Sequence, residues 1–152
     1  MKNFCLFLAF LFLLIVSVRS DIIKDSCDEA AKGDPNMKSD FCVATIANAT
    51  ATGSTVSKLL QNTSLDKFTR SCLEACSELY SNAGSDLQSG GEAFKSKDFG
   101  TAKFDLSAAI VAPVTCEDGF KEKQGLVSPL TKENENMRQL AVIPLAFIDM
   151  VK

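Results

Sequence analysis

Apolar residues recur at steps of three, four or seven along much of this chain, and that spacing most constrains its fold. Such recurrence places side chains on one face of an α-helix. The first stripe is Leu65, Phe68, Cys72, Cys76, Leu79, Ala83, Leu87 and Phe94. The second is Phe99, Ala102, Leu106, Ala109, Pro113, Cys116 and Phe120, and the third is Met137, Leu140, Ala141, Pro144, Leu145, Ile148 and Val151. Sustained alternation, which is typical of a strand, is absent, so the pattern predicts an all-α chain.

Short connections between these stripes favour an up-and-down helix bundle. Ser64 and Thr131 are the predicted N-caps of the first and third helices. Pro113 and Pro144 lie within helical stripes, so we expect each to kink or break its helix. Residues 43–61, rich in Ala and Thr, predict only a weak helix.

The first twenty residues predict a secretory signal peptide over residues 1–20. Lys2 gives a basic start, residues 4–16 are an unbroken apolar run, and Ser20 precedes the expected cleavage site. This run is too short to cross a bilayer, which needs about 20 residues. We therefore expect one mature domain over residues 21–152, with no membrane segment after cleavage.

Composition excludes several classes of function. The chain has 16 Lys plus Arg and 19 Asp plus Glu, a net charge of −3, which becomes −5 once Lys2 and Arg19 are removed with the signal peptide. An acidic chain without a basic cluster lacks the electrostatic footprint of a nucleic-acid-binding protein. Because the chain has no His, Ser-His-Asp and Cys-His catalysis are excluded. We expect no cofactor, no bound metal and no enzymatic activity.

The mature chain keeps five cysteines: Cys27, Cys42, Cys72, Cys76 and Cys116. In an oxidising compartment pairing is the default, and an odd number leaves at least one thiol free or intermolecular. Any four of them allow three pairings, and the sequence alone does not choose. Cys72 and Cys76 would lie about 5–6 Å apart at Cβ on a helix, beyond the roughly 3.5–4.5 Å of a disulfide, so we do not expect them to bond each other. Asn48 and Asn62 begin N-x-[ST] sequons and are candidate glycosylation sites.

Five ordered segments of the sequence resemble the plant invertase and pectin methylesterase inhibitor family, and within it the branch of pollen allergens described as invertase inhibitors. The segments are residues 76–80, 94–99, 107–109, 115–120 and 128–134. The likeness extends over residues 65–152, and also over residues 27–43, where the spacing of the two cysteines matches that branch.

This resemblance implies a four-helix bundle preceded by an N-terminal helical hairpin. It implies disulfides Cys27–Cys42 and Cys76–Cys116, with Cys72 as the extra thiol. It also implies a protein inhibitor that docks stoichiometrically on plant invertase or pectin methylesterase. We expect the protein to be a monomer. Such a protein would be secreted to the cell wall or apoplast, with the vacuole as the alternative.

The sequence departs from the family pattern at two functional places. Family members carry a longer stretch between the second cysteine and residues 56–60, so we expect the first bundle helix to be truncated to a stub. Invertase inhibitors also carry a Pro-Lys-Phe loop that enters the target, and Lys97, Asp98 and Phe99 stand at the equivalent place here without the proline. These three residues are the candidate target contacts. The alternative function is a degenerate, non-inhibitory bundle with a structural or interaction role.

Overall fold

The computed structural model describes residue 28 and residues 39–150. Within this part the chain forms four helices and no strand: α2 (Ser39–Leu60), α3 (Lys67–Lys95), α4 (Phe99–Lys121) and α5 (Thr131–Met150). The predicted all-α class is confirmed. The signal peptide, most of the N-terminal hairpin and Cys27 lie outside the described residues, as does the side chain of Cys42.

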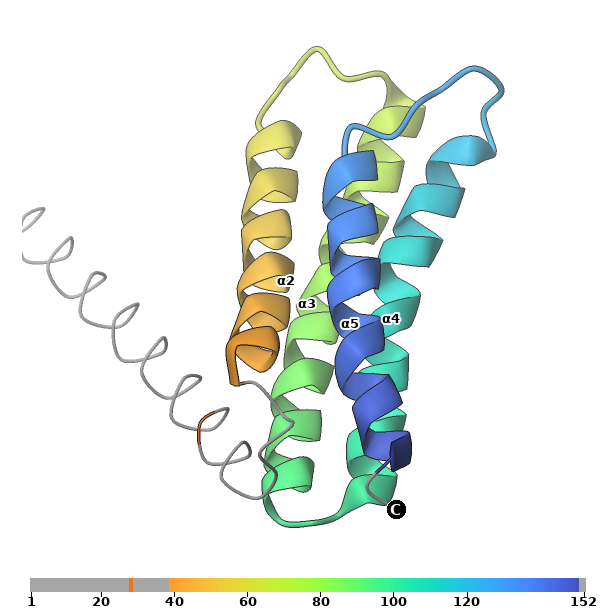
Figure 1. The fold of residues 1–152 in the computed structure, drawn as a ribbon. Coiled ribbons are helices and arrows are strands. Elements are labelled where there is room, and N and C mark those ends of the chain that lie inside the picture. Colours follow the sequence, from red (N-terminus) through yellow and green to blue (C-terminus); the bar gives the residue numbers. More distant parts are fainter. Residues whose placement is uncertain (1–27, 29–38, 151–152) are drawn as a thin grey trace, which may run out of the picture.

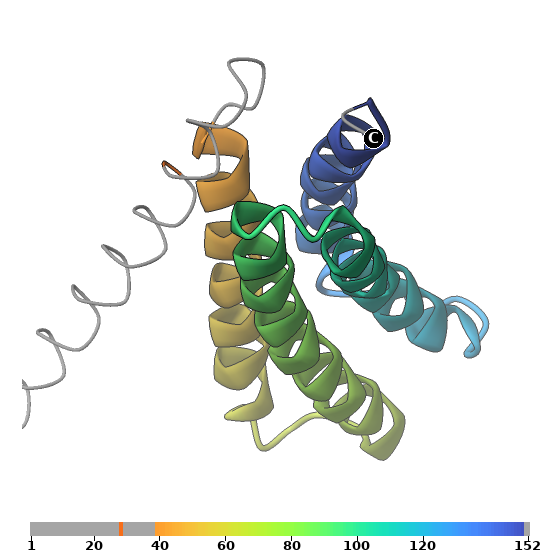
Figure 2. The same cartoon turned by 90° about the horizontal axis from the view of Figure 1, so that it is seen from below.

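The four helices run alternately up and down, as Figure 1 shows. Helix α3 packs against α2 and α4, and α5 packs against α4 and α2, so each helix has two neighbours and the core lies inside a ring of four. Seen along the bundle, α2 lies beside α3 and α5 beside α4 (Figure 2). The predicted up-and-down four-helix bundle is therefore confirmed.

Helix α2 is not the stub that the short interval after Cys42 led us to expect. It extends over 22 residues, close to the 23 of α4. Its many Ser and Thr side chains donate to carbonyl oxygens within the same helix, as Thr50 Oγ1 does to Ile46 O at 2.9 Å. Ala49 and Val56 are buried on its inner face. Tertiary packing of this face thus stabilises a segment whose intrinsic helix propensity is low.

The N-cap of α3 is Asp66 and not the predicted Ser64. The Asp66 carboxylate accepts hydrogen bonds from the backbone N–H groups of Phe68 and Thr69, as an N-cap does. The buried stripe of α3 is Leu73, Cys76, Tyr80, Ala83, Leu87, Gly90 and Phe94, with steps of three and four in strict alternation. Cys72 and Leu79, which we placed on the core face, are only half-buried. Each has a neighbour that is itself largely apolar, Leu73 or Tyr80, and it is this neighbour that is buried. The spacing alone therefore favoured the wrong residue of each pair.

In α4 the predicted core stripe is buried from Ala102 to Phe120. Its first residue, Phe99, is only half-buried. Pro113 lies inside α4 without ending it, and α5 likewise continues through position 144. The expectation that these prolines would break their helices is therefore wrong. Pro113 removes one helical N–H donor, but it is fully buried within the bundle. Packing on the ring and on the turns around it offsets the lost hydrogen bond.

A disulfide between Cys76 and Cys116 joins the first half of α3 to the second half of α4, with the two Cα atoms 5.0 Å apart. It closes 40 residues of chain. On the chain-entropy model, a loop of that length stabilises the folded state by about 4 kcal/mol. Nearer the α3–α4 corner, a Cβ placed on Gly90 would come within 3.2 Å of Asp105 Cβ, so glycine permits the two helices to approach there.

A buried polar network connects three of the helices. Tyr80 of α3 donates from its hydroxyl to Asn134 Oδ1 of α5 at 2.8 Å. Asn134 Nδ2 in turn donates to Glu117 Oε2 of α4 at 2.7 Å. Glu117 Oε1 accepts from the hydroxyl of Thr131, so Thr131 bonds across to α4 as the first residue of α5 and does not serve as the predicted cap. Burial also raises the pKa of Tyr80 well above its usual range, which keeps the phenol a donor.

Replacing Asn134 tests how much this network contributes. Asn134→Ala leaves the buried Tyr80 hydroxyl without its acceptor, so we expect the free energy of unfolding to fall by about 1–3 kcal/mol in urea titrations. Asn136→Ala, at an exposed position of the same helix, is the control and should change it by less than about 0.5 kcal/mol. Equal effects of the two substitutions would contradict a structural role for the network.

Candidate functional site

The residues predicted to contact a target form the corner between α3 and α4. Backbone N–H groups of Lys97 and Asp98 donate to the carbonyls of Phe94 and Ala93, both at 2.9 Å. This pair of bonds is a Schellman motif, which ends a helix on a residue in the left-handed conformation. Lys97 is that residue, with φ 64°, and it is the one non-glycine residue with positive φ in the described part of the chain. The corner is therefore tightly hydrogen-bonded around a lysine at a position that favours glycine.

The Asp98 side chain caps the N-terminus of α4. Its Oδ1 accepts from the backbone N–H of Thr101 at 3.0 Å, and its Oδ2 accepts from the Thr101 hydroxyl at 2.8 Å. These bonds favour the ionised carboxyl, so they lower the pKa of Asp98. Asp98 thus fixes the direction in which α4 leaves the corner.

Phe99 anchors the corner on the core. Its ring meets that of Phe94 edge-on, with centroids 5.4 Å apart, and the side chain is half-buried. Of the three predicted contacts, Lys97 is the one whose side chain is exposed and is neither a cap nor part of the ring pair. The structure brings the three residues together, but in three different roles.

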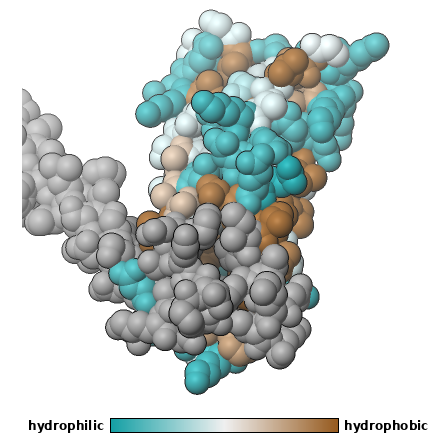
Figure 3. Space-filling model, viewed as in Figure 1, coloured by the Kyte–Doolittle hydropathy of each residue, from teal (hydrophilic) through white to brown (hydrophobic). Residues whose placement is uncertain are grey.

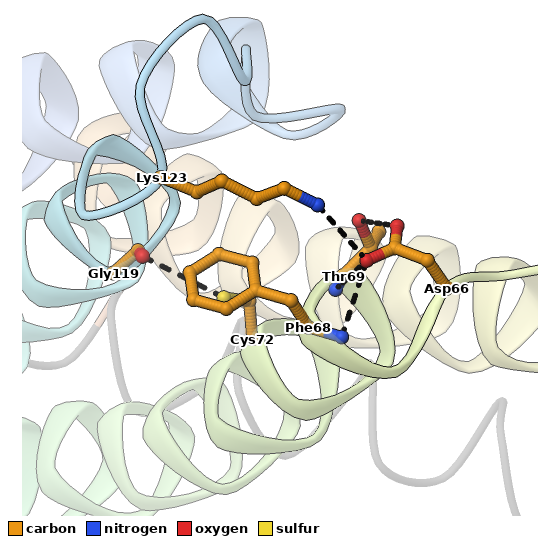
Figure 4. A network of polar contacts seen from close by, with 6 residues as sticks. All are labelled: Asp66, Phe68, Thr69, Cys72, Gly119 and Lys123. Atoms are coloured by element: carbon orange, nitrogen blue, oxygen red, sulfur yellow. Dashed lines mark hydrogen bonds and ion pairs between the residues drawn. The ribbon is translucent and has the colours of Figure 1, made fainter.

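A second polar cluster lies at the opposite end of the bundle (Figure 4). Lys123 Nζ lies 3.3 Å from Asp66 Oδ1 and 5.5 Å from the centre of the Phe68 ring. Hydrogen bonds from the Thr69 hydroxyl and backbone, together with Lys123, lower the pKa of Asp66 to about 2. The cluster ties the start of α3 to the loop after α4.

Cys72 lies beneath this cluster as a free thiol. Its Sγ is 3.6 Å from the carbonyl oxygen of Gly119 on α4. Burial, with the charges of Glu122 and Asp66, raises the pKa of the Cys72 thiol. The thiol is therefore held protonated, which makes it a poor nucleophile.

A groove of about 360 Å³ lies between α4 and α5. Its lining residues are Pro113, Val114, Glu117, Asp118, Lys121, Thr131, Asn134, Glu135 and Arg138. Lys121 pairs with Asp118 at 2.8 Å and Arg138 with Glu135 at 2.7 Å, each within its own helix. Because the charged groups already pair with neighbours, the groove offers a mixed surface and not a site for one charged ligand.

The outward face of α4 carries apolar side chains that we did not predict as a surface feature. Phe104, Val111 and Val114 are 75%, 55% and 42% exposed. Phe104 and Val111 lie opposite the core stripe of the helix, and Val114 lies at the side that lines the groove with α5. A search for a second apolar stripe on the same helix would have found them, because they recur at steps of seven and three.

The two sequons lie in different environments. Asn48 is half-buried inside α2, and its Oδ1 is fully buried without a hydrogen-bond partner. Asn62 is exposed just after α2, where its Oδ1 accepts from Ser64 N at 3.0 Å. Asn62 is thus the more accessible of the two candidate glycosylation sites.

Comparison with known proteins identifies relatives over most of the chain. The family model described as plant invertase/pectin methylesterase inhibitor matches residues 24–147. A protein of Platanus acerifolia named "Putative invertase inhibitor" is 36% identical, covering 98% of this chain and 96% of its own length. Its counterpart from Platanus orientalis is 34% identical, covering 95% and 98%. "Pectinesterase inhibitor 12" of Arabidopsis thaliana is 40% identical over 52% of this chain and 45% of its own length.

A solved structure shares the fold. The crystal structure of a pectin methylesterase inhibitor from Arabidopsis thaliana superposes with a TM-score of 0.66 at 20% identity, covering 88% of this chain and 78% of its own. The match with the first Platanus protein spans 172 positions, more than the 152 residues here, so some of that protein's residues have no counterpart in this chain. Among the helices that the structure describes, none has the length and apolar character needed to cross a membrane.

The backbone of the corner gives a test that needs no partner. Because left-handed φ costs a lysine but not a glycine, Lys97→Gly should raise the free energy of unfolding by about 0.5–1 kcal/mol. Lys95→Gly, within the last turn of α3, should instead lower it by about 0.5–1 kcal/mol. Urea denaturation of both variants provides the measurement, and destabilisation by Lys97→Gly would contradict the assigned backbone conformation.

Proposed function

The chain belongs to the plant invertase/pectin methylesterase inhibitor family, and from this premise we propose that it is a secreted inhibitor that docks stoichiometrically on a plant carbohydrate-active enzyme. The observation that carries the proposal is the family match over residues 24–147, together with near-complete alignment to two proteins named as invertase inhibitors. We propose that the protein itself has no enzymatic activity.

Invertase is the target that we propose first. The relatives named for invertase align over 98% and 95% of the chain, whereas the relative named for pectinesterase aligns over 52%. The missing proline of the Pro-Lys-Phe loop favours pectin methylesterase as the second candidate. Direct titration of both enzymes separates the two.

The corner between α3 and α4 is the contact that we propose with invertase. Lys97 supplies an exposed cation, Asp98 orients the following helix, and Phe99 anchors the loop on the core. A loop already held by its own hydrogen bonds loses little conformational entropy when it binds. This rigidity supports a docking role for the corner.

The alternative of a degenerate, non-inhibitory bundle has lost part of its basis. It depended on a stub in place of the first bundle helix and on prolines that break helices. Helix α2 instead has 22 residues, and Pro113 lies within an unbroken α4. What still supports the alternative is the altered loop at Lys97–Phe99.

Removing the charge of Lys97 tests the corner. Lys97→Asn removes the cation while keeping a residue that tolerates the left-handed conformation. We expect inhibition of invertase to weaken about tenfold with an unchanged melting temperature, because a charge at an interface edge contributes about 1 kcal/mol or more. Lys95→Gln is the matched control and should inhibit like the parent. Unchanged inhibition by Lys97→Asn would remove the corner from the proposed interface, and no inhibition of either enzyme by the folded parent would favour the alternative function.

Secretion and glycosylation can be tested in one measurement. We expect the protein recovered from the medium of plant cells to begin at Asp21, and to carry one N-glycan, at Asn62. Asn62→Gln should remove the glycan mass, whereas Asn48→Gln should leave it, because the Asn48 amide is turned into the bundle. Intact-mass spectrometry of the three proteins gives the result. A retained N-terminal segment would contradict the signal peptide, and a glycan on Asn48 would contradict this placement of its side chain.

A further inference from the structure

The seam between α3 and α4 holds two carboxylates that are not freely exposed. Figure 3 shows hydrophilic side chains spread over the upper part of one face of the bundle, where charged groups meet solvent. Asp86 of α3 and Asp105 of α4 are instead half-buried. Burial disfavours an ionised carboxylate, and a second negative charge nearby disfavours it further. The position of these two residues relative to each other therefore decides whether they repel.

The register of the seam places these two residues opposite each other. Gly90 lies close to α4, because a Cβ on it would come within 3.4 Å of Ala102 O and 3.2 Å of Asp105 Cβ. The Ser89 hydroxyl also donates to Asp105 Oδ2 at 2.5 Å, so this carboxylate reaches towards α3. Asp86 is one turn before Gly90, and Asp105 is one turn after Ala102. Because the two helices run antiparallel, Asp86 and Asp105 lie at the same level of the seam.

The same register extends along the seam and agrees with the disulfide. The residues of α3 in the seam are Cys72, Cys76, Leu79, Ala83, Asp86 and Gly90, and those opposite them on α4 are, in the same order, Gly119, Cys116, Ala112, Ala109, Asp105 and Ala102. The Cys76–Cys116 disulfide and the contact of Cys72 Sγ with Gly119 O give the first two pairs directly. The other positions carry small or apolar side chains. Asp86 and Asp105 are the two charged members of this seam, and both are negative.

No cation faces this pair in the described part of the bundle. The residues one turn away on the same two helices carry no charge: they are Asn82, Ala83, Ser89 and Gly90 on α3, and Thr101, Ala102, Ala108 and Ala109 on α4. Lys103 is two positions from Asp105, so it lies on another side of α4. Helix α2 also packs against α3, and its charged residues are Asp40, which is acidic, and Lys58. Lys58 lies near the end of α2 that meets the start of α3, far from Asp86.

Burial and the charge of Asp105 raise the pKa of Asp86 in the folded protein. As pH falls through this raised pKa, the folded state takes up a proton that the unfolded state takes up only at lower pH, so the folded state gains stability. Few other groups titrate in the same range. The chain has no His, so no imidazole changes its charge between about pH 5 and 8. Asp66 and Glu135 have pKa values of about 2, and the stability that they contribute is lost only at lower pH.

We propose that Asp86 and Asp105 form a pH-responsive pair that makes the bundle more stable in mildly acidic than in neutral solution. At neutral pH both carboxylates are ionised, and their repulsion opposes the close approach of α3 and α4. In mildly acidic solution a proton from the solvent binds the Asp86 carboxylate. The resulting carboxyl then donates to Asp105 Oδ1, because Oδ2 already accepts from Ser89. This property belongs to the fold and does not depend on the proposed function.

Thermal unfolding of the secreted mature protein and of Asp86→Asn, from about pH 4 to pH 7, tests the pair. Asparagine has nearly the shape of a protonated aspartate but does not titrate. Asp86→Asn should melt about 2–4 °C above the parent at pH 7, and the difference should shrink as pH falls. The result is the change of this difference with pH, so a constant offset from the substitution itself does not affect it. A difference that stays constant, or that grows as pH falls, would overturn the proposal.

A second substitution tests whether the two carboxylates act on each other. Asp105→Asn should change the pH profile in the same way, and the double variant should gain no more than either single variant, because either change ends the repulsion. In Asp105→Asn the Asp86 carboxyl, followed by its carbon-13 chemical shift, should titrate at lower pH than in the parent. Glu74→Gln, at an exposed position of α3, is the matched control and should keep the parent profile. Additive gains from the two Asp substitutions, or an unchanged titration of Asp86, would overturn the pairing.

Discussion

Two contacts hold α3 against α4, and the other packing of the bundle is arranged around them. The Cys76–Cys116 disulfide fixes the two backbones 5.0 Å apart at Cα, in the first half of α3 and the second half of α4. Gly90 lets the same helices approach again towards the corner. With both points fixed, the chain must reverse direction between Lys95 and Phe99. That short reversal forces a residue into the left-handed conformation, and the constraint falls on Lys97.

The buried hydrogen bonds of Asn134 attach α5 to this pair in one register. Apolar packing alone would tolerate sliding of a helix along its neighbours, because one aliphatic contact resembles the next. Tyr80 and Glu117 can each bond to Asn134 only at one position of α5 along the bundle axis. Sliding would leave the buried Tyr80 hydroxyl and the buried Asn134 amide without partners, at a cost of about 1–3 kcal/mol for each. The network therefore adds specificity more than net stability.

The spacing of apolar residues predicted the helices, but it did not always predict which residues of a helix are buried. The stripe of α4 was readable because small and apolar residues recur at steps of three and four over its whole length. On α3, apolar or weakly polar residues stand at both 72 and 73 and at both 79 and 80, so only the packing of α2 and α4 decides which is buried. The stability of α2 could not be read locally, since it depends on burial against α3 and α5. The division of roles at Lys97, Asp98 and Phe99 likewise follows from the corner's hydrogen bonds, which no spacing encodes.

Helix α4 carries one buried apolar stripe and a second, exposed set of apolar side chains. The inner one fits the bundle, and its Ala102, Ala109 and Ala112 keep the neighbouring helices close. The outer one is not needed for folding, because the core is complete without Phe104 and Val111. Exposed aromatic and β-branched side chains reduce solubility, so an outer stripe of this kind is more readily explained by binding than by stability.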